Sequence, residues 1–169
     1  TANTAVSDGG AIYADSSCPN IIGCIFTKNT VMRYGGAIYL NSRNNVVDRC
    51  VFDSNSADDD GGAIYVDGPE NIKYIIQNCT FINNTAWYEG GAIYFWGDGN
   101  ILDISDSTFI KNQNHKDNGG GAIYLNAEST GIRNSIFENN LARSSAGGAI
   151  NIDSKNTQGV LISNCIFNN

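Results

Sequence analysis

The chain has 169 residues, 41% of them hydrophobic, and a net charge of −7. This length and composition suffice for one folded domain with a core, and they exclude a disordered or collagen-like chain. The acidic balance and the lack of clustered Lys and Arg exclude a nucleic-acid partner, because phosphate binding needs concentrated positive charge. The sequence contains no membrane span, since no apolar run approaches the roughly 18 residues that a spanning helix needs.

Two short blocks alternate along the whole chain. The first is Gly-Gly-Ala-Ile-Tyr, and its Ala recurs at intervals of 26 to 30 residues, at Ala11, Ala37, Ala63, Ala92, Ala122 and Ala149. The second is a small residue followed two positions later by Phe, as Cys24/Phe26, Cys50/Phe52, Cys79/Phe81, Ser107/Phe109, Ser135/Phe137 and Cys165/Phe167. Six copies of each block indicate tandem structural repeats.

The repeats favour strands over helices. No copy contains a 3.6-residue apolar period, so a helix-bearing repeat such as a leucine-rich repeat is disfavoured. Each copy instead holds three short β-rich runs, near Gly-Ala-Ile-Tyr, near an Ile or Val, and near the Phe. We therefore predict an all-β fold, a parallel β-helix of about six coils of 26–30 residues that forms a single domain over residues 1–169.

Side-chain alternation predicts which residues face the core of each coil. In the Gly-Ala-Ile-Tyr strands, the Ile and the residue two positions later are apolar in every copy, so this face should be buried. The Tyr between them should form an outward stacked stripe at Tyr13, Tyr39, Tyr65, Tyr94 and Tyr124. This stripe either binds a sugar or another rod or only stabilises the stack, and Trp87 and Trp96 are expected to extend its binding or assembly surface.

Further ladders are expected at the turns. A change of parity between the Ile or Val run and the Phe run predicts a turn at Gly23, Arg49, Asn78, Asp106, Asn134 and Asn164. An Asn three residues after Phe predicts a ladder of side-chain amides at Asn29, Asn55, Asn84, Asn112 and Asn140. The paired Gly should serve a positive φ or a close approach of coils, and a phosphate loop is disfavoured because the pair occurs six times in a β context.

The five cysteines are an odd number, and three of them stand on successive coils at Cys24, Cys50 and Cys79. Parallel Cβ vectors would hold these Cβ atoms about 4.8 Å apart, beyond the ~3.8 Å usual in disulfides. Buried free thiols are therefore favoured. Cys18 lies outside this ladder and has no assigned role.

Candidate sites are few. The run Asp58, Asp59 and Asp60 could hold Ca²⁺ or supply paired carboxylates, but consecutive residues before Gly61 are better explained as a solvated loop. His115 is the only His, and nothing marks it as catalytic. We therefore predict no catalytic residue, cofactor or metal site. Two sequons make Asn78 and Asn83 candidates for glycosylation.

The blocks Gly-Gly-Ala-Ile-Tyr and Phe-x-x-Asn resemble the repeats of chlamydial polymorphic outer-membrane proteins and of adhesin-like proteins of methanogenic archaea. The segment Asn83-Asn84-Thr85-Ala86 is most similar to the archaeal version. The resemblance implies a right-handed, pectin-lyase-like β-helix with an extracellular or cell-surface location and a role in attachment or envelope architecture.

A non-catalytic structural or adhesive β-helix is therefore the expected function, with surface glycans or proteins as partners. The alternative is a polysaccharide-active lyase or glycoside hydrolase, or a carbohydrate-binding module, since many β-helices act on polysaccharides. Neither end of the sequence resembles a polar cap, so we expect a segment of a longer β-helix or a subunit that stacks head to tail into a filament or envelope layer.

Overall fold

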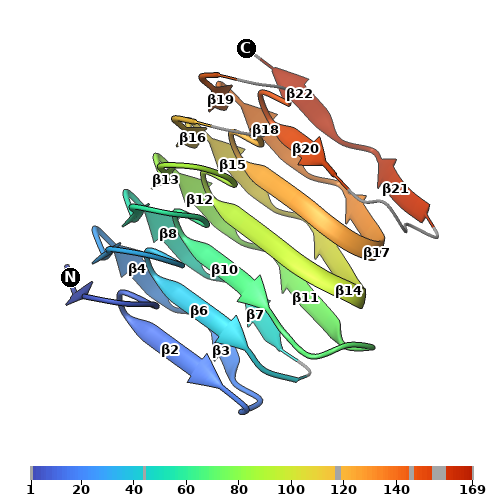
Figure 1. The fold of residues 1–169 in the computed structure, drawn as a ribbon. Coiled ribbons are helices and arrows are strands. Elements are labelled where there is room, and N and C mark those ends of the chain that lie inside the picture. Colours follow the sequence, from blue (N-terminus) through green and yellow to red (C-terminus); the bar gives the residue numbers. More distant parts are fainter. Residues whose placement is uncertain (1, 44, 117–118, 145–146, 154–158, 169) are drawn as a thin grey trace.

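The computed structural model describes residues 2–43, 45–116, 119–144, 147–153 and 159–168, and only the backbone of residues 98 and 128. Within these ranges the chain forms 22 β-strands and no helix. Each coil has four strand positions, of which β14 and β17 each fill two as one long strand. Equivalent positions of successive coils pair in parallel and form four stacks, in which each coil contributes one rung (Figure 1). The result is a right-handed parallel β-helix, which confirms the predicted fold.

Each stack is built from one position of the repeat. The first comprises β1 (Thr4–Ala5), β5 (Thr30–Val31), β9 (Ser56–Ala57), β13 (Thr85–Ala86), β16 (Gln113–Asn114) and β19 (Leu141–Ala142). The second comprises β2 (Ile12–Asp15), β6 (Ile38–Asn41), β10 (Ile64–Asp67), β14 (Ile93–Ser105), β17 (Ile123–Arg133) and β20 (Ile150–Ile152). The third comprises β3 (Asn20–Ile22), β7 (Val46–Asp48), β11 (Lys73–Gln77), the later parts of β14 and β17, and β21 (Gly159–Ser163). The fourth comprises β4 (Ile25–Thr27), β8 (Val51–Asp53), β12 (Thr80–Ile82), β15 (Thr108–Ile110), β18 (Ile136–Glu138) and β22 (Ile166–Asn168).

The sequence predicted three strands per coil, and the structure has four. The additional strands are the two-residue strands of the first stack. The sequence prediction placed no strand between the Phe run and the next Gly pair. The second and third stacks belong to one sheet, because β14 and β17 continue through the corner that separates β10 from β11.

The interior is filled by aligned apolar rows, as side-chain alternation predicted. Ile64 pairs in register with Ile38 and Ile93, and all three are fully buried. Phe rings of neighbouring rungs stack with centroids 4.7 to 4.9 Å apart, close to the spacing of paired strands. The Phe rings therefore stack at nearly the same spacing as the hydrogen-bonded strands, so both contacts can form together along the axis of the β-helix.

Both expected roles of the paired glycines occur, one at each position. Gly90 has a φ of 63°, a left-handed conformation that Gly adopts without strain. A Cβ on Gly91 would lie 2.1 Å from the carbonyl oxygen of Gly121 in the next rung. Any side chain there would push the coils apart.

The predicted turn positions all have a positive φ, between 50° and 65°, at Gly23, Arg49, Asn78, Asp106, Asn134 and Asn164. A second row with positive φ stands two residues after Phe and was not predicted: Lys28, Ser54, Asn83, Lys111 and Asn139. The two rows turn the chain from one stack to the next, before and after each Phe strand.

The asparagine ladder is confirmed. The Nδ2 of every member except Asn140 donates to the Oδ1 of the next rung over 2.8 to 3.0 Å, and Asn3 extends the row by one member. Most of these side chains are fully buried, so the ladder satisfies polar groups inside the fold.

The thiols of the cysteine ladder are buried in the central rungs. Cys50 and Cys79 are each 1% exposed, whereas Cys24 and Cys165 are half-buried and Cys18 is exposed. Cys50 Sγ donates to the carbonyl oxygen of Asp48 at 3.3 Å and accepts from Cys24 N at 3.4 Å. A hydrogen bond with Cys50 and burial together raise the pKa of the Cys79 thiol. All five cysteines, each within the described ranges, are free.

Candidate binding surfaces

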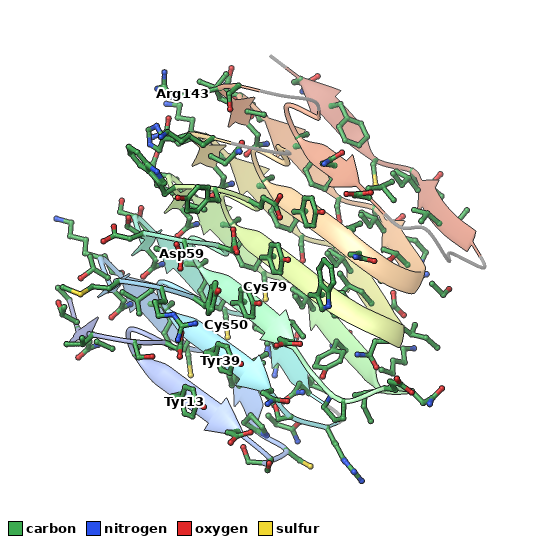
Figure 2. The ribbon with its side chains drawn as sticks, viewed as in Figure 1. Tyr13, Tyr39, Cys50, Asp59, Cys79 and Arg143 are labelled. Carbon is green, nitrogen blue, oxygen red and sulfur yellow. The ribbon has the colours of Figure 1, made fainter. Side chains whose placement is uncertain are left out.

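The tyrosine ladder runs along the outer face of the second stack, as predicted. Neighbouring rings stack at 5.0 Å for Tyr13 and Tyr39, 5.4 Å for Tyr39 and Tyr65, 4.8 Å for Tyr65 and Tyr94, and 5.1 Å for Tyr94 and Tyr124. The planes of each pair differ by no more than 10°. Figure 2 shows Tyr13 and Tyr39 side by side on this face.

The expectation of an exposed stripe is wrong for most of the ladder. Tyr65, Tyr94 and Tyr124 are only 2 to 8% exposed, and Tyr34 from the preceding loop stacks on Tyr65 at 4.5 Å. Each ring covers the faces of its neighbours, so these rings offer edges rather than faces to a ligand. Burial raises the pKa of all three phenols, and it raises the pKa of Tyr39 to about 12 with a further contribution from Asp67.

The two tryptophans belong to different surfaces. Trp96 is 43% exposed and lies parallel to Tyr94 at 6.5 Å, so it extends the outer face of the second stack. Trp87, which follows β13, is 44% exposed. Its ring packs 5.4 Å from that of His115, and Lys116 Nζ lies 5.2 Å from the ring centre. Trp87 therefore anchors a separate aromatic and basic corner.

A buried asparagine holds this corner in place. Asn114 replaces the Ala that occupies the equivalent position in β9, β13 and β19. Its Nδ2 donates to the carbonyl oxygens of Tyr88 at 2.6 Å and Lys116 at 2.8 Å. The sequence prediction missed Asn114, although an amide within a row of Ala was a visible signal.

The acidic run lies in the loop before Gly61. Asp58 is exposed, and Asp59 and Asp60 are half-buried. Asp60 Oδ1 accepts a hydrogen bond of 3.0 Å from Glu89 N in the next coil. Across the described residues, no group of three or more His, Cys, Asp or Glu side chains could hold a metal ion. The carboxylate of Asp60 thus helps to join two neighbouring coils.

The two glycosylation candidates differ in their surroundings. Both Asn78 and Asn83 are exposed and have a positive φ. Asn78 Nδ2 donates to Asp48 Oδ1 at 2.9 Å, and this hydrogen bond lowers the pKa of Asp48. Modification at Asn78 would break that contact. Glycosylation at either residue stays a prediction.

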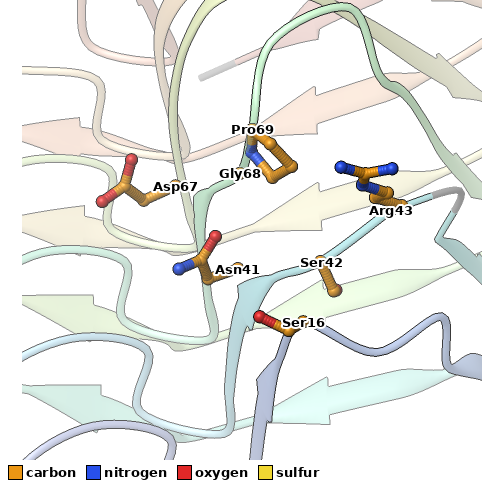
Figure 3. Close-up of a pocket in the computed structure, with 7 residues that line it drawn as sticks. All are labelled: Ser16, Asn41, Ser42, Arg43, Asp67, Gly68 and Pro69. Carbon is orange, nitrogen blue, oxygen red and sulfur yellow. The ribbon is translucent and has the colours of Figure 1, made fainter.

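A polar pocket of about 610 Å³ lies beside the tyrosine ladder, at the corner between the second and third stacks (Figure 3). It is lined by Ser16, Asn41, Ser42, Arg43, Asp67, Gly68 and Pro69. The sequence prediction named none of these residues. The available signal was the third coil, where Ile64 and Ile76 are three residues farther apart than Ile38 and Val47 in the second coil.

The parallel stacks, the inward Phe and Asn ladders and the glycine-rich turns define a right-handed parallel β-helix. The chain belongs to the right-handed β-helix family, whose description as a right-handed beta helix region matches residues 1–115. Residues 106–126 match the repeat of the Chlamydia polymorphic membrane proteins. No curated protein and no solved structure gave a match. Among the described residues, no helix is long and apolar enough to cross a membrane.

Proposed function

We propose that the chain is a non-catalytic, extracellular β-helix with a structural or adhesive role at a cell surface. The observation that carries this proposal is the continuity of its ladders, in which the Phe, Asn and Gly positions link each rung to the next. Such stacking makes a stiff rod that can hold contact residues away from an envelope. The likeness of residues 106–126 to a membrane-protein repeat supports the location.

The outer face supports a role in recognition. Inside the fold, equivalent positions keep the same chemical character from rung to rung, as the Phe, Asn and apolar rows do. On the outer face of the second stack, the position two residues after Tyr changes from coil to coil, as Asp15, Asn41, Asp67, Trp96, Asn126 and Asp153. An interior of constant chemical character with a varied outer row suits a scaffold that presents different contact groups. Glycans or proteins of a facing surface are the partners we propose.

Self-association is the second part of the proposal. Every rung pairs through its backbone with the rungs beside it, so further coils of the same polypeptide or of a second copy can continue the stacks. Negative-stain electron microscopy with intact mass measurement of native material separates these arrangements. Filaments of units near 18.1 kDa would mean stacked copies. Single rods would mean coils within one chain.

Location and adhesion are tested on intact cells. Antibodies against the chain should label the outer surface of unpermeabilised source cells in immunogold microscopy. Beads coated with the chain should adhere to a facing cell layer more than beads coated with an unrelated acidic protein. Label confined to the cell interior would contradict the proposal. Sustained polysaccharide turnover that is lost on substitution of Asp58, Asp59 and Asp60 would favour the enzyme alternative.

A further inference from the structure

The pocket between the second and third coils is bordered by the loop that joins β10 to β11. The chain crosses this corner in four residues between β2 and β3 and between β6 and β7, whereas β14 and β17 pass through it as continuous strands. Among the first five coils, the longest connection at this corner joins β10 to β11, where five residues, 68–72, intervene and extend outward (Figure 1). The repeat itself does not require a loop at this corner, because β14 and β17 pass through it without one.

Buried polar groups hold the inner side of the loop. Tyr74, 1% exposed, donates from Oη to the carbonyl oxygen of Ser42 at 2.7 Å. Ser42 Oγ donates in turn to Asn45 Oδ1 at 2.8 Å. A Cβ on Gly68 would lie 1.5 Å from Tyr74 Oη, so only Gly leaves room for this hydroxyl.

The fourth coil holds the other side. Asn100, fully buried, donates from Nδ2 to the carbonyl oxygen of Gly68 at 3.2 Å and accepts from Ile72 N at 2.9 Å. Both ends of the loop are therefore fixed to Asn100, and Gly68 and Pro69 at its start line the pocket together with residues of the second coil. Buried polar networks of this kind restrict a segment to one conformation. The pocket wall is preorganised.

The groups that line the pocket are free to meet a ligand. Arg43 and Asp67 border the same cavity, and within the described part of the chain neither forms an ion pair. Asn41 also lines the cavity, and its amide can both donate and accept. The guanidinium only donates and the carboxylate only accepts, so the three side chains together match the hydroxyl groups of a sugar, which do both.

Charge and size narrow the ligand class. An anionic ligand would approach Asp67, and a cationic ligand would approach Arg43, so the lining disfavours a net charge of either sign. The volume of about 610 Å³ lies within the usual range for small-molecule sites, roughly 300 to 1,000 Å³. We propose that this pocket binds one or two residues of a neutral carbohydrate, through Asn41, Arg43 and Asp67. The inference deepens the proposed adhesive function and rests on it for its biological meaning.

Binding can be measured on the isolated chain, apart from any surface location. An array of glucose-, galactose-, mannose- and N-acetylglucosamine-terminated oligosaccharides, with uronate- and sialate-terminated ones beside them, identifies the preferred probe. Calorimetric titration with that probe should then show that Arg43→Ala and Asp67→Asn each lower the affinity about tenfold or more, since each removes a hydrogen bond to a charged group. Arg143→Ala and Asp58→Asn, at exposed residues that do not line the pocket, are the matched controls and should leave the affinity unchanged.

Several results would overturn the proposal. These are no binding to any neutral glycan, preference for the acidic probes, or binding that both pocket variants retain while Trp87→Ala abolishes it. Circular dichroism of each variant should show an intact fold, because Arg43 and Asp67 are exposed. If the chain binds glycans but lies inside the cell, only the proposed surface role is contradicted. If antibodies label it at the surface but it binds no glycan, only the proposed sugar-binding role of the pocket is contradicted.

Discussion

Asn84 Nδ2 donates a hydrogen bond of 2.9 Å to Asn112 Oδ1 in the next rung, and both side chains are fully buried. The same Nδ2 also donates to the carbonyl oxygen of Phe52 at 2.9 Å, while Asn84 Oδ1 accepts from the backbone and side chain of Asn55. One amide thus links its own rung to the rungs on either side. The ladder gives the interior a polar spine that fixes the register of the coils.

Asn84→Ala should therefore lower the free energy of unfolding by about 2 to 4 kcal/mol. The substitution leaves the buried backbone N–H of Asn55 and the carbonyl oxygen of Phe52 without these partners. Urea denaturation measures the change. Asn20→Ala, at an exposed strand position, is the control and should cost less than about 0.5 kcal/mol. Equal losses for the two variants would mean that the ladder adds no stability.

The two kinds of glycine predict different penalties for the same substitution. Gly91→Ala places a Cβ 2.1 Å from a backbone oxygen that cannot move without separating the coils, so the loss should reach at least about 4 kcal/mol. Gly23→Ala meets no atom within 4 Å and carries only the strain of its positive φ, about 1 kcal/mol. Thermal unfolding compares them. A smaller effect at Gly91 than at Gly23 would contradict the close approach of the coils.

The tyrosine ladder predicts a loss of stability in alkali. Burial raises the pKa of Tyr39 to about 12 and raises those of Tyr65, Tyr94 and Tyr124, whereas an unfolded Tyr titrates near 10. Above about pH 10 the unfolded chain loses protons that the folded chain keeps, so the free energy of unfolding falls as the pH rises. The contribution is fully present below pH 10 and is lost as the pH rises through the folded pKa values.

Urea denaturation at a series of alkaline pH values tests this slope. Tyr65→Phe keeps the stacked ring and removes one raised phenol, so it should make the decline between about pH 10 and pH 12 less steep. A parallel titration of tyrosinate absorbance should show a late, cooperative rise as the fold opens. A slope that Tyr65→Phe leaves unchanged would assign the alkaline loss to other groups.

Features repeated in every coil could be predicted from the sequence. Each Phe, Asn and turn residue recurs in register, so one interpretation explains six positions at once, and alternation assigned their faces correctly. The strands of the first stack were missed because two residues are too few to show a β pattern. The burial of Tyr65 could not be foreseen, since the loop residue before the glycine pair varies, and only in the second coil is it an aromatic that folds over the ladder, Tyr34.

Features that occur in only one coil could not be predicted, because no repetition in the sequence marks them. Arg43 and Asp67 come from different coils and carry no repeated signal, so their meeting at one pocket depends on the loop after β10. The longer third coil was visible in the sequence. Its consequence was not, because the direction of the loop depends on Tyr74 and Asn100, whose hydrogen bonds are tertiary.

The loop itself supplies a last prediction, through a double-mutant cycle at Gly68 and Tyr74. Gly68→Ala alone should cost about 3 kcal/mol or more, because its Cβ would overlap Tyr74 Oη. Tyr74→Phe removes that oxygen and the bond to Ser42, at a cost of about 1 to 2 kcal/mol. The remaining approach to Tyr74 Cζ, 2.8 Å, is a milder conflict.

In the Tyr74→Phe background, Gly68→Ala should therefore cost at least about 1 kcal/mol less than in the parent chain, within the range usual for residues in contact. Tyr34→Phe, a tyrosine that stacks on the ladder instead, is the matched control and should show no coupling to Gly68→Ala. Additive losses at Gly68 and Tyr74, measured by urea denaturation, would mean that the hydroxyl does not lie under the loop. The preorganised wall of the pocket would then lose its physical basis.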